Sequence, residues 1–164
     1  MRLFLKQDTS EEGGCFVILD ESGDICFRVT GEPVFGGTVL YLFGREGLRL
    51  ARIRQYAMQP YCFSVITAGE GESATLLQNP AGGKALLKVS RKNWRLRGDI
   101  IARSFDLIDA SGRVLMIHGK CWEPRRSYYE INLNEERNAV LCLSIAVCID
   151  YLASCGGKTV VAIN

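Results

Sequence analysis

Apolar residues follow two different patterns along this chain. Up to about residue 133 they fall in short runs, many of them alternating with polar residues and separated by Gly, Asp, Asn and Ser. Between Ala139 and Ile149 nearly every position is apolar. Many short strands with turn residues between them are typical of a β-sandwich or barrel, and a helix that is apolar on all sides must be buried.

The period-two runs predict about a dozen strands. In 84–89 three apolar residues share one face of the strand, while Lys84 and Lys88 take the other. The parity of the apolar residues changes within 48–55, which predicts a β-bulge near Ala51. The predicted strands are 2–6, 15–19, 25–29, 38–43, 48–55, 61–66, 74–78, 84–90, 94–100, 104–108, 114–119 and 128–133.

Three predicted hairpins resemble one another. Residues 16–27 and 105–116 both place Asp-x-x-Gly between two strands, and 41–50 is a looser copy. Asp and Ser make local side-chain turns, and Gly supplies the left-handed residue that closes a short loop. The sheet therefore contains either related units or ordinary antiparallel hairpins with the same turn chemistry.

We expect a helix over 135–154, with Asn134 as its N-cap and Gly156-Gly157 ending it. The apolar run is shorter than the about 20 residues that a bilayer requires, and Asp150 interrupts it. Residues 158–163 would form a last strand that closes the sheet. A helix of about 28 Å fits inside a barrel of roughly eleven strands or more. The expected fold is a single domain over 1–164, mainly β, with a roughly twelve-stranded antiparallel barrel enclosing the C-terminal helix.

Composition narrows the possible chemistry. The seven cysteines have no metal-ligand spacing, so we expect reduced, structural thiols and no metal. Neither Gly69-Glu-Gly71 nor Gly82-Gly83 belongs to a phosphate-binding loop, and no cofactor is expected. Without a visible secretory signal or transmembrane segment, we expect a cytoplasmic protein, peripheral membrane contact being one option.

Charge is unevenly distributed. Residues 73–98 carry six bases and no acid, although the net charge is only +2. Trp94 in this segment lies either at an interface beside the bases or, as alternation favours, in the core. A sequence pI of about 8.2 makes nucleic acid an unfavoured partner. The candidate binding residues for an anionic partner are Lys88, Arg91, Lys92, Arg95 and Arg97.

Other candidates have weaker support. Trp122, with Arg125 and Arg126, forms either a contact loop or an ordinary charged loop. His118 and Cys121 point to opposite faces if they share a strand, so they do not predict a nucleophilic pair. Asp150 should either reach solvent at a barrel mouth or pair with a base. No catalytic residue is assigned, and we do not expect an enzyme.

Several segments together resemble the tubby C-terminal-like superfamily, most closely its LURP-one-related branch and more distantly the phospholipid scramblases. They are 41–55, 98–100, 104–114 and 128–131, followed by the apolar helix that ends at Asp150. The resemblance covers almost the whole chain and implies a roughly twelve-stranded barrel threaded by a hydrophobic helix. It also implies phosphoinositide binding of the kind that tubby shows. The acidic calcium-binding segment, Pro-rich N-terminus and cysteine cluster of the scramblases have no counterpart here.

The leading hypothesis is a non-enzymatic module that binds anionic phospholipid headgroups, or an anionic protein, through its basic residues. The alternative is a structural or protein-interaction domain without a lipid ligand. The amino-acid sequence does not determine the oligomeric state.

Overall fold

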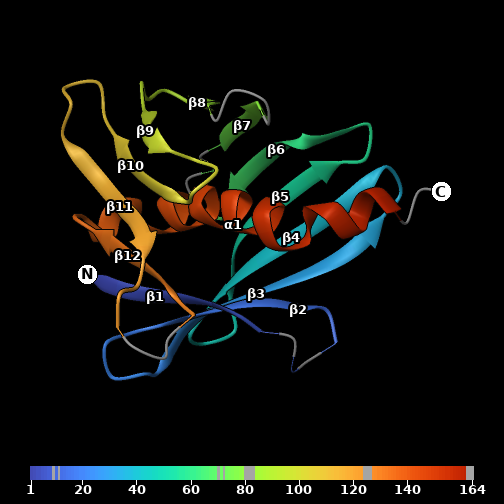
Figure 1. Cartoon of the computed structure of the whole chain (residues 1–164), viewed down its shortest axis with the longest axis horizontal. Coiled ribbons are helices and arrows are strands. Elements are labelled where there is room, and N and C mark those ends of the chain that lie inside the picture. Colours follow the sequence, from blue (N-terminus) through green and yellow to red (C-terminus); the bar gives the residue numbers. More distant parts are fainter. Residues whose placement is uncertain are drawn as a thin grey trace.

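The computed structural model describes residues 1–8, 10, 12–69, 71, 73–79, 84–123 and 127–161. Twelve strands form one antiparallel sheet, and a 3-10 helix and one α-helix follow them. Figure 1 shows the sheet curved around the helix. The elements are β1 (Arg2–Gln7), β2 (Gly14–Leu19), β3 (Ile25–Val34), β4 (Gly37–Gly44), β5 (Arg49–Tyr56), β6 (Gln59–Thr67), β7 (Ser73–Asn79), β8 (Lys84–Val89), β9 (Arg95–Asp99), β10 (Ser104–Ile108), β11 (Val114–Lys120), β12 (Tyr129–Leu133), η1 (Glu136–Asn138) and α1 (Ala139–Val161).

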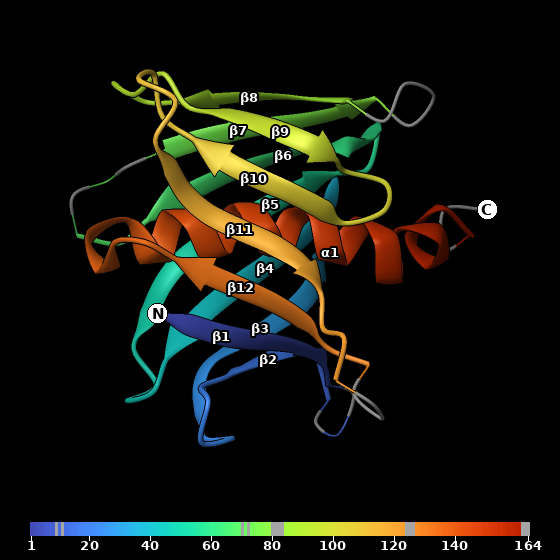
Figure 2. The same cartoon turned by 60° about the vertical axis from the view of Figure 1, so that its left-hand side comes forward.

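The barrel is closed except at one seam. The strand order is β8-β7-β6-β5-β4-β3-β2-β1-β12-β11-β10-β9, so β8 and β9 are the two edges of the sheet. They lie next to each other (Figure 2), and in the turn between them Lys92 forms an isolated bridge with Val89, the last residue of β8. We call this line between β8 and β9 the seam.

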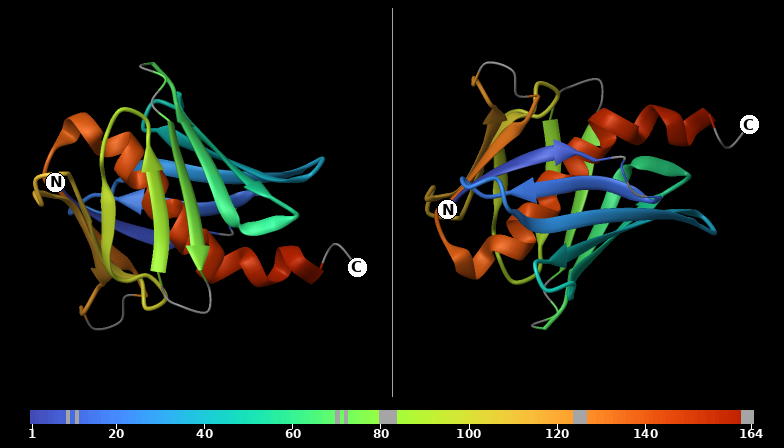
Figure 3. Two further views of the ribbon diagram at one scale, coloured as in Figure 1. Left: turned by 90° about the horizontal axis from the view of Figure 1, so that it is seen from above. Right: turned by 90° about the horizontal axis from the view of Figure 1, so that it is seen from below.

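The antiparallel order gives the barrel two distinct ends. The connections β1–β2, β3–β4, β5–β6, β7–β8, β9–β10 and β11–β12 all lie at one end. The C-terminal part of α1 emerges there, because Arg103 of the β9–β10 turn contacts Ser154. We call this end the mouth (Figure 3). The N-terminal part of α1 lies at the opposite end, where Lys92 of the β8–β9 turn bonds Asn138.

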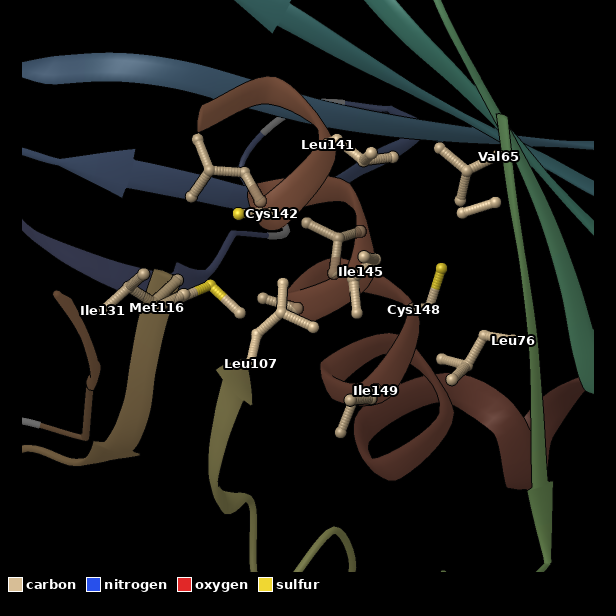
Figure 4. Packing of buried hydrophobic residues seen from close by; sticks show 14 of the residues in the cluster. Val65, Leu76, Leu107, Met116, Ile131, Leu141, Cys142, Ile145, Cys148 and Ile149 are labelled. Carbon is tan, nitrogen blue, oxygen red and sulfur yellow. The ribbon is translucent and has the colours of Figure 1, made fainter. Parts of the chain in front are cut away.

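The core is the space between α1 and the inner face of the sheet. Figure 4 shows Ile145 and its neighbours on α1 packed between Leu107 and Met116 on one side and Val65 and Leu76 on the other. All these side chains are buried. Over residues 141–151 this packing removes the whole circumference of the helix from water, as the all-round apolar pattern requires.

The length argument against a membrane span was wrong. By length and composition, Glu136–Ser154 is long and apolar enough to cross a bilayer. Of that segment, 67% is buried inside the protein, as in the core helix of a soluble protein. Enclosure by the sheet therefore accounts for its apolarity.

The predicted strands are confirmed, with differences of a few residues at their ends. The bulge is also confirmed: Leu42 pairs with Ala51 and Phe43 with Arg49, which leaves Leu50 as the extra residue. In the first two similar hairpins, the Asp20 and Asp109 carboxylates accept from backbone N–H groups two and four residues later. The bond from the Asp24 N–H lowers the pKa of the Asp20 carboxyl, and the bond from the Ser111 hydroxyl, together with the backbone bonds, lowers the pKa of the Asp109 carboxyl. The two turns thus share one conformation.

The predicted ends of the helix were wrong. Asn134 does not cap it: its amide donates to the Val114 carbonyl, and an extended Glu135 precedes η1. At the other end α1 continues through Gly156-Gly157 to Val161, so the predicted strand 158–163 is helical as far as Val161, and its remainder lies outside the described residues. Each Gly costs only about 1 kcal/mol in a helix, which does not end one anchored in a core.

The thiols follow the expectation for structural cysteines. None of the six cysteines whose side chains the structure describes forms a disulfide, and Cys142 and Cys148 are completely enclosed. Burial raises the pKa of the Cys148 thiol well above its ordinary value. A thiol in this state behaves as a small apolar side chain.

Truncating Ile145, which is fully buried on α1, should lower the free energy of unfolding by about 2–5 kcal/mol in the variant Ile145→Ala, because a cavity remains. The matched variant is Ile101→Ala, whose side chain is exposed in the β9–β10 turn and should change stability by less than about 0.5 kcal/mol. Urea denaturation followed by circular dichroism measures both. Equal losses would contradict the central position of α1 in the core.

Candidate functional site

The five predicted binding residues lie together along the seam. Lys88 is on β8, Arg91 and Lys92 are in the turn that follows, and Arg95 and Arg97 are on β9. All but the partly buried Lys92 are exposed. Trp94 is buried in the core, which confirms the core alternative and removes it as an interfacial anchor.

Two of these five cations already have partners. The Lys92 ammonium donates to Asn138 Oδ1 at 3.2 Å and lies 4.9 Å from the centre of the Trp94 ring. The Arg97 guanidinium forms an ion pair with Asp106 at 2.7 Å. Lys88, Arg91 and Arg95 form no ion pair with any residue that the structure describes. Within the predicted site, Lys88, Arg91 and Arg95 are therefore the cations that no described acidic residue neutralises.

A buried cluster of charged residues lies near the mouth. His118 Nε2 and Asp150 Oδ2 are 2.7 Å apart, and Arg103 Nη1 donates to Asp150 Oδ1 at 3.2 Å. The other ring nitrogen of His118, Nδ1, lies 2.7 Å from the Arg103 carbonyl oxygen. The pairing of Asp150 with a base is thus confirmed. We call these three residues the Arg103 cluster.

Aromatic rings hold the Arg103 cluster in place. The His118 ring stacks between Phe105, at 4.6 Å, and Tyr129, at 5.3 Å. The Arg103 guanidinium lies 4.0 Å from the centre of the Tyr129 ring. Arg103 also has a left-handed backbone, with φ of 57°, which is rare for a residue other than Gly. No local pattern in the sequence predicts this arrangement, because its members are far apart in the chain.

A pocket of about 550 Å³ opens at the mouth beside the Arg103 cluster. Two cationic residues, Arg103 and Lys120, contribute to its wall, and no acidic residue lines it in the described part of the chain. Its volume is typical of sites for small molecules. The other lining residues are Leu5, Gln7, Phe16, Ser127, Tyr128, Tyr129 and Ser154.

Large apolar side chains project from four turns around the mouth. The exposed fraction is 102% for Phe35, 94% for Met58, 65% for Ile101 and 87% for Trp122. We call these four residues the apolar rim. The Ala57 N–H donates to the Gly36 carbonyl at 2.9 Å, so the turns that carry Phe35 and Met58 touch.

Two acidic side chains near the mouth are paired with bases, whereas Asp99 accepts a hydrogen bond from the Ala102 backbone N–H. Asp8 lies 4.0 Å from Arg28, and Glu123 lies 3.8 Å from Arg2. Among the described residues no three His, Cys, Asp or Glu side chains converge as a metal site would require. The mouth therefore combines exposed apolar groups with a cationic pocket, an arrangement suited to an amphipathic, anionic ligand.

Most of the apolar rim was missed from the sequence. Only Trp122 was singled out there, and Arg125 and Arg126, which follow it, lie outside the described residues. Phe35 precedes Gly36-Gly37, and this pair was the available sign of a turn. An apolar residue in a turn looks the same in sequence as one at the end of a buried strand.

Removing Asp150 should strongly destabilise the protein, because Asp150→Ala leaves Arg103 and His118 without their shared partner in a buried site. We expect a loss of about 3–5 kcal/mol in the free energy of unfolding. The matched variant Asp106→Ala breaks the exposed ion pair with Arg97 and should cost about 1 kcal/mol or less. Chemical denaturation compares the two, and similar losses would contradict the buried role of Asp150.

Comparison with known proteins is consistent with this architecture. No match was found among curated proteins. A solved structure of a protein from Arabidopsis thaliana superposes with a TM-score of 0.61 at 18% identity, covering 91% of this chain and 90% of that one. At that identity the likeness shows the fold alone. The LURP-one-related family model matches residues 1–150, and the chain therefore belongs to the LURP-one-related family.

Proposed function

We propose that this protein is a non-enzymatic module that docks on anionic phospholipid surfaces with its mouth toward the membrane. The observation that carries the proposal is the apolar rim, in which four separate turns at one end of the barrel each expose a large apolar side chain. At the opposite end, the large apolar residues exposed in the described part of the chain are Met1, Leu48 and Ile66, and of these only Leu48 lies in a connection between two strands. The two ends thus differ in the way that a membrane-facing end and a solvent-facing end would.

Isolated apolar side chains on turns suit a lipid surface better than a protein surface. A protein interface buries a continuous, closely packed patch, whereas single side chains can enter the boundary between headgroups and acyl chains separately. Fully burying a side chain of this size contributes about 1.5–3 kcal/mol. Tyr56 and Tyr61, which flank the turn of Met58 and are partly exposed, belong to a residue type enriched at membrane interfaces.

Charge complementarity supports an anionic surface. Lys120 is exposed at the mouth and Arg103 is partly exposed there. Each cation near an anionic bilayer contributes about 1 kcal/mol. The resemblance to the tubby C-terminal-like superfamily, in which tubby binds phosphoinositides, favours the same class of ligand.

The seam remains an alternative contact surface for the same ligand. Arg91 lies in a turn at the end opposite the mouth, so a flat bilayer that contacts the apolar rim would not reach it. Docking through the mouth and docking through Lys88, Arg91, Lys92, Arg95 and Arg97 are therefore two orientations that variants can separate.

The geometry of His118 favours binding over catalysis. Both of its ring nitrogens are directed at oxygen atoms of the protein, Asp150 Oδ2 and the Arg103 carbonyl. A general base must instead reach the proton of a substrate.

Polar substitution in the apolar rim should weaken membrane binding. We expect Phe35→Ser/Trp122→Ser to reduce partitioning onto phosphatidylserine-containing vesicles by at least about tenfold, because two inserted side chains are lost. Leu48→Ser, at the opposite end, is the matched control and should bind normally. Co-sedimentation at low and physiological salt provides the measurement. Unchanged binding of the rim variant would exclude docking through the mouth.

Charge reversal tests the orientation. Lys120→Glu should reduce binding to the same vesicles by about tenfold or more, because an attractive cation becomes a repulsive anion. Arg95→Glu/Arg97→Glu should leave binding unchanged if the mouth is the contact surface. The reverse pattern would identify the seam. Binding that does not depend on lipid charge would contradict the proposal and favour a protein-interaction domain.

A further inference from the structure

We infer that the pocket at the mouth is a binding site for an oxyanion, the phosphate or carboxylate group of a small organic molecule, held by Arg103 and Lys120. The pocket and the Arg103 cluster support this site whether or not the mouth contacts a membrane. The oxyanion could belong to a lipid headgroup or to a soluble molecule, and the experiment below separates these sources.

The hydrogen bonds of His118 determine the net charge of the Arg103 cluster. The Arg103 carbonyl can only accept, so His118 Nδ1 must carry a proton. The 2.7 Å contact between Nε2 and Asp150 Oδ2 needs one further proton, located either on the ring or on the carboxyl group. In the first case His⁺, Asp⁻ and Arg⁺ sum to +1. In the second case neutral His, neutral Asp and Arg⁺ also sum to +1.

The cluster therefore has one positive charge that nothing within it balances. An uncompensated charge in a largely buried site is costly because it has lost hydration. Asp150 and His118 are enclosed, whereas the Arg103 side chain is 22% exposed and lines the pocket. An anion in the pocket is placed to balance this charge, and Lys120 adds a second cation.

Arg103 retains donors for such an anion. Its Nη1 group bonds Asp150 at 3.2 Å and Ser154 at 3.5 Å. A guanidinium has five N–H donors, so the Nη2 and Nε groups have no hydrogen-bond partner in the described part of the chain. The contact with Asp150 and the stacking on Tyr129 fix the plane of the group before any ligand arrives. A preorganised planar fork is the geometry that recognises phosphate and carboxylate.

The rest of the pocket indicates an organic ligand rather than a bare ion. Gln7, Ser127 and Ser154 supply polar groups, whereas Leu5 and Phe16 supply an apolar wall. A volume of about 550 Å³ leaves space beyond the oxyanion for a polar or partly apolar body.

Isothermal titration with glycerol 3-phosphate and succinate, with glycerol as the uncharged control, tests the inference. We expect the wild-type protein to bind at least one of the two anions and not glycerol. Lys120→Ala removes an exposed cation and should weaken binding about tenfold, whereas Lys88→Ala, on the seam, should have no effect. Wild-type protein that binds neither anion, or anion binding that Lys120→Ala leaves unchanged, would overturn the inference.

A second variant and a spectroscopic signal address Arg103 itself. Arg103→Lys keeps the charge beside Asp150 but loses the planar fork, so binding should weaken by about tenfold or more while the protein stays folded by circular dichroism. In the wild-type protein the added anion should shift the ¹⁵N resonances of the His118 ring, because the anion balances the charge of the cluster to which the ring belongs. Anion binding without this shift would place the site elsewhere.

Competition identifies the source of the oxyanion. If soluble glycerol 3-phosphate displaces the protein from vesicles that contain phosphatidic acid, the pocket takes the lipid headgroup. If it binds in a Lys120-dependent way without displacing the protein, the pocket takes a soluble anion. The variant Phe35→Ser/Trp122→Ser should retain glycerol 3-phosphate binding, so a failure of membrane docking is distinguishable from a failure of the pocket.

Discussion

Burial of a helix that is apolar on every side is the constraint on which this structure depends. Such a helix cannot rest on one face of an open sheet, because half of its side chains would remain in water. The sheet must surround it, and twelve antiparallel strands do so with β8 and β9 meeting at the seam. The curvature of the sheet, the position of the core and the existence of two ends all follow from this enclosure.

Enclosure also explains why polar chemistry is concentrated at one end of the helix. Asp150 is on a completely buried turn of α1, so its carboxyl group needs partners from the surrounding strands. His118 comes from β11 and Arg103 from the β9–β10 turn, and both reach Asp150 near the place where α1 leaves the barrel. Arg103 has a left-handed backbone conformation. In this conformation its carbonyl bonds His118 while its guanidinium bonds Asp150. A single buried carboxylate thus links the core to the pocket.

The periodic parts of the fold could be predicted from the sequence, and the parts that depend on tertiary contacts could not. Alternation along β8 and the phase change at Leu50 are local signals, and both were confirmed. The ends of α1 depend on the Val114 carbonyl and on packing inside the barrel, and no local pattern contains these contacts. The Arg103 cluster joins residues that are 15, 32 and 47 positions apart. Only the three-dimensional register brings such residues together, whereas the line of bases in 84–97 was visible because it is continuous in sequence.

The pairing of β1 with β12 has a consequence for how the chain folds. Arg2 lies opposite Asn132, so the first strand of this sheet lies between β2 and its last strand, β12. The strands β1 to β8 and β9 to β12 are two sequential meanders that can form from local hairpins, but only the β1–β12 ladder joins them within the sheet. Contacts over such a sequence separation slow folding because of the entropy of closing a long loop. During synthesis, one edge of β1 stays unpaired until β12 has been made, and the sheet can enclose α1 only after that.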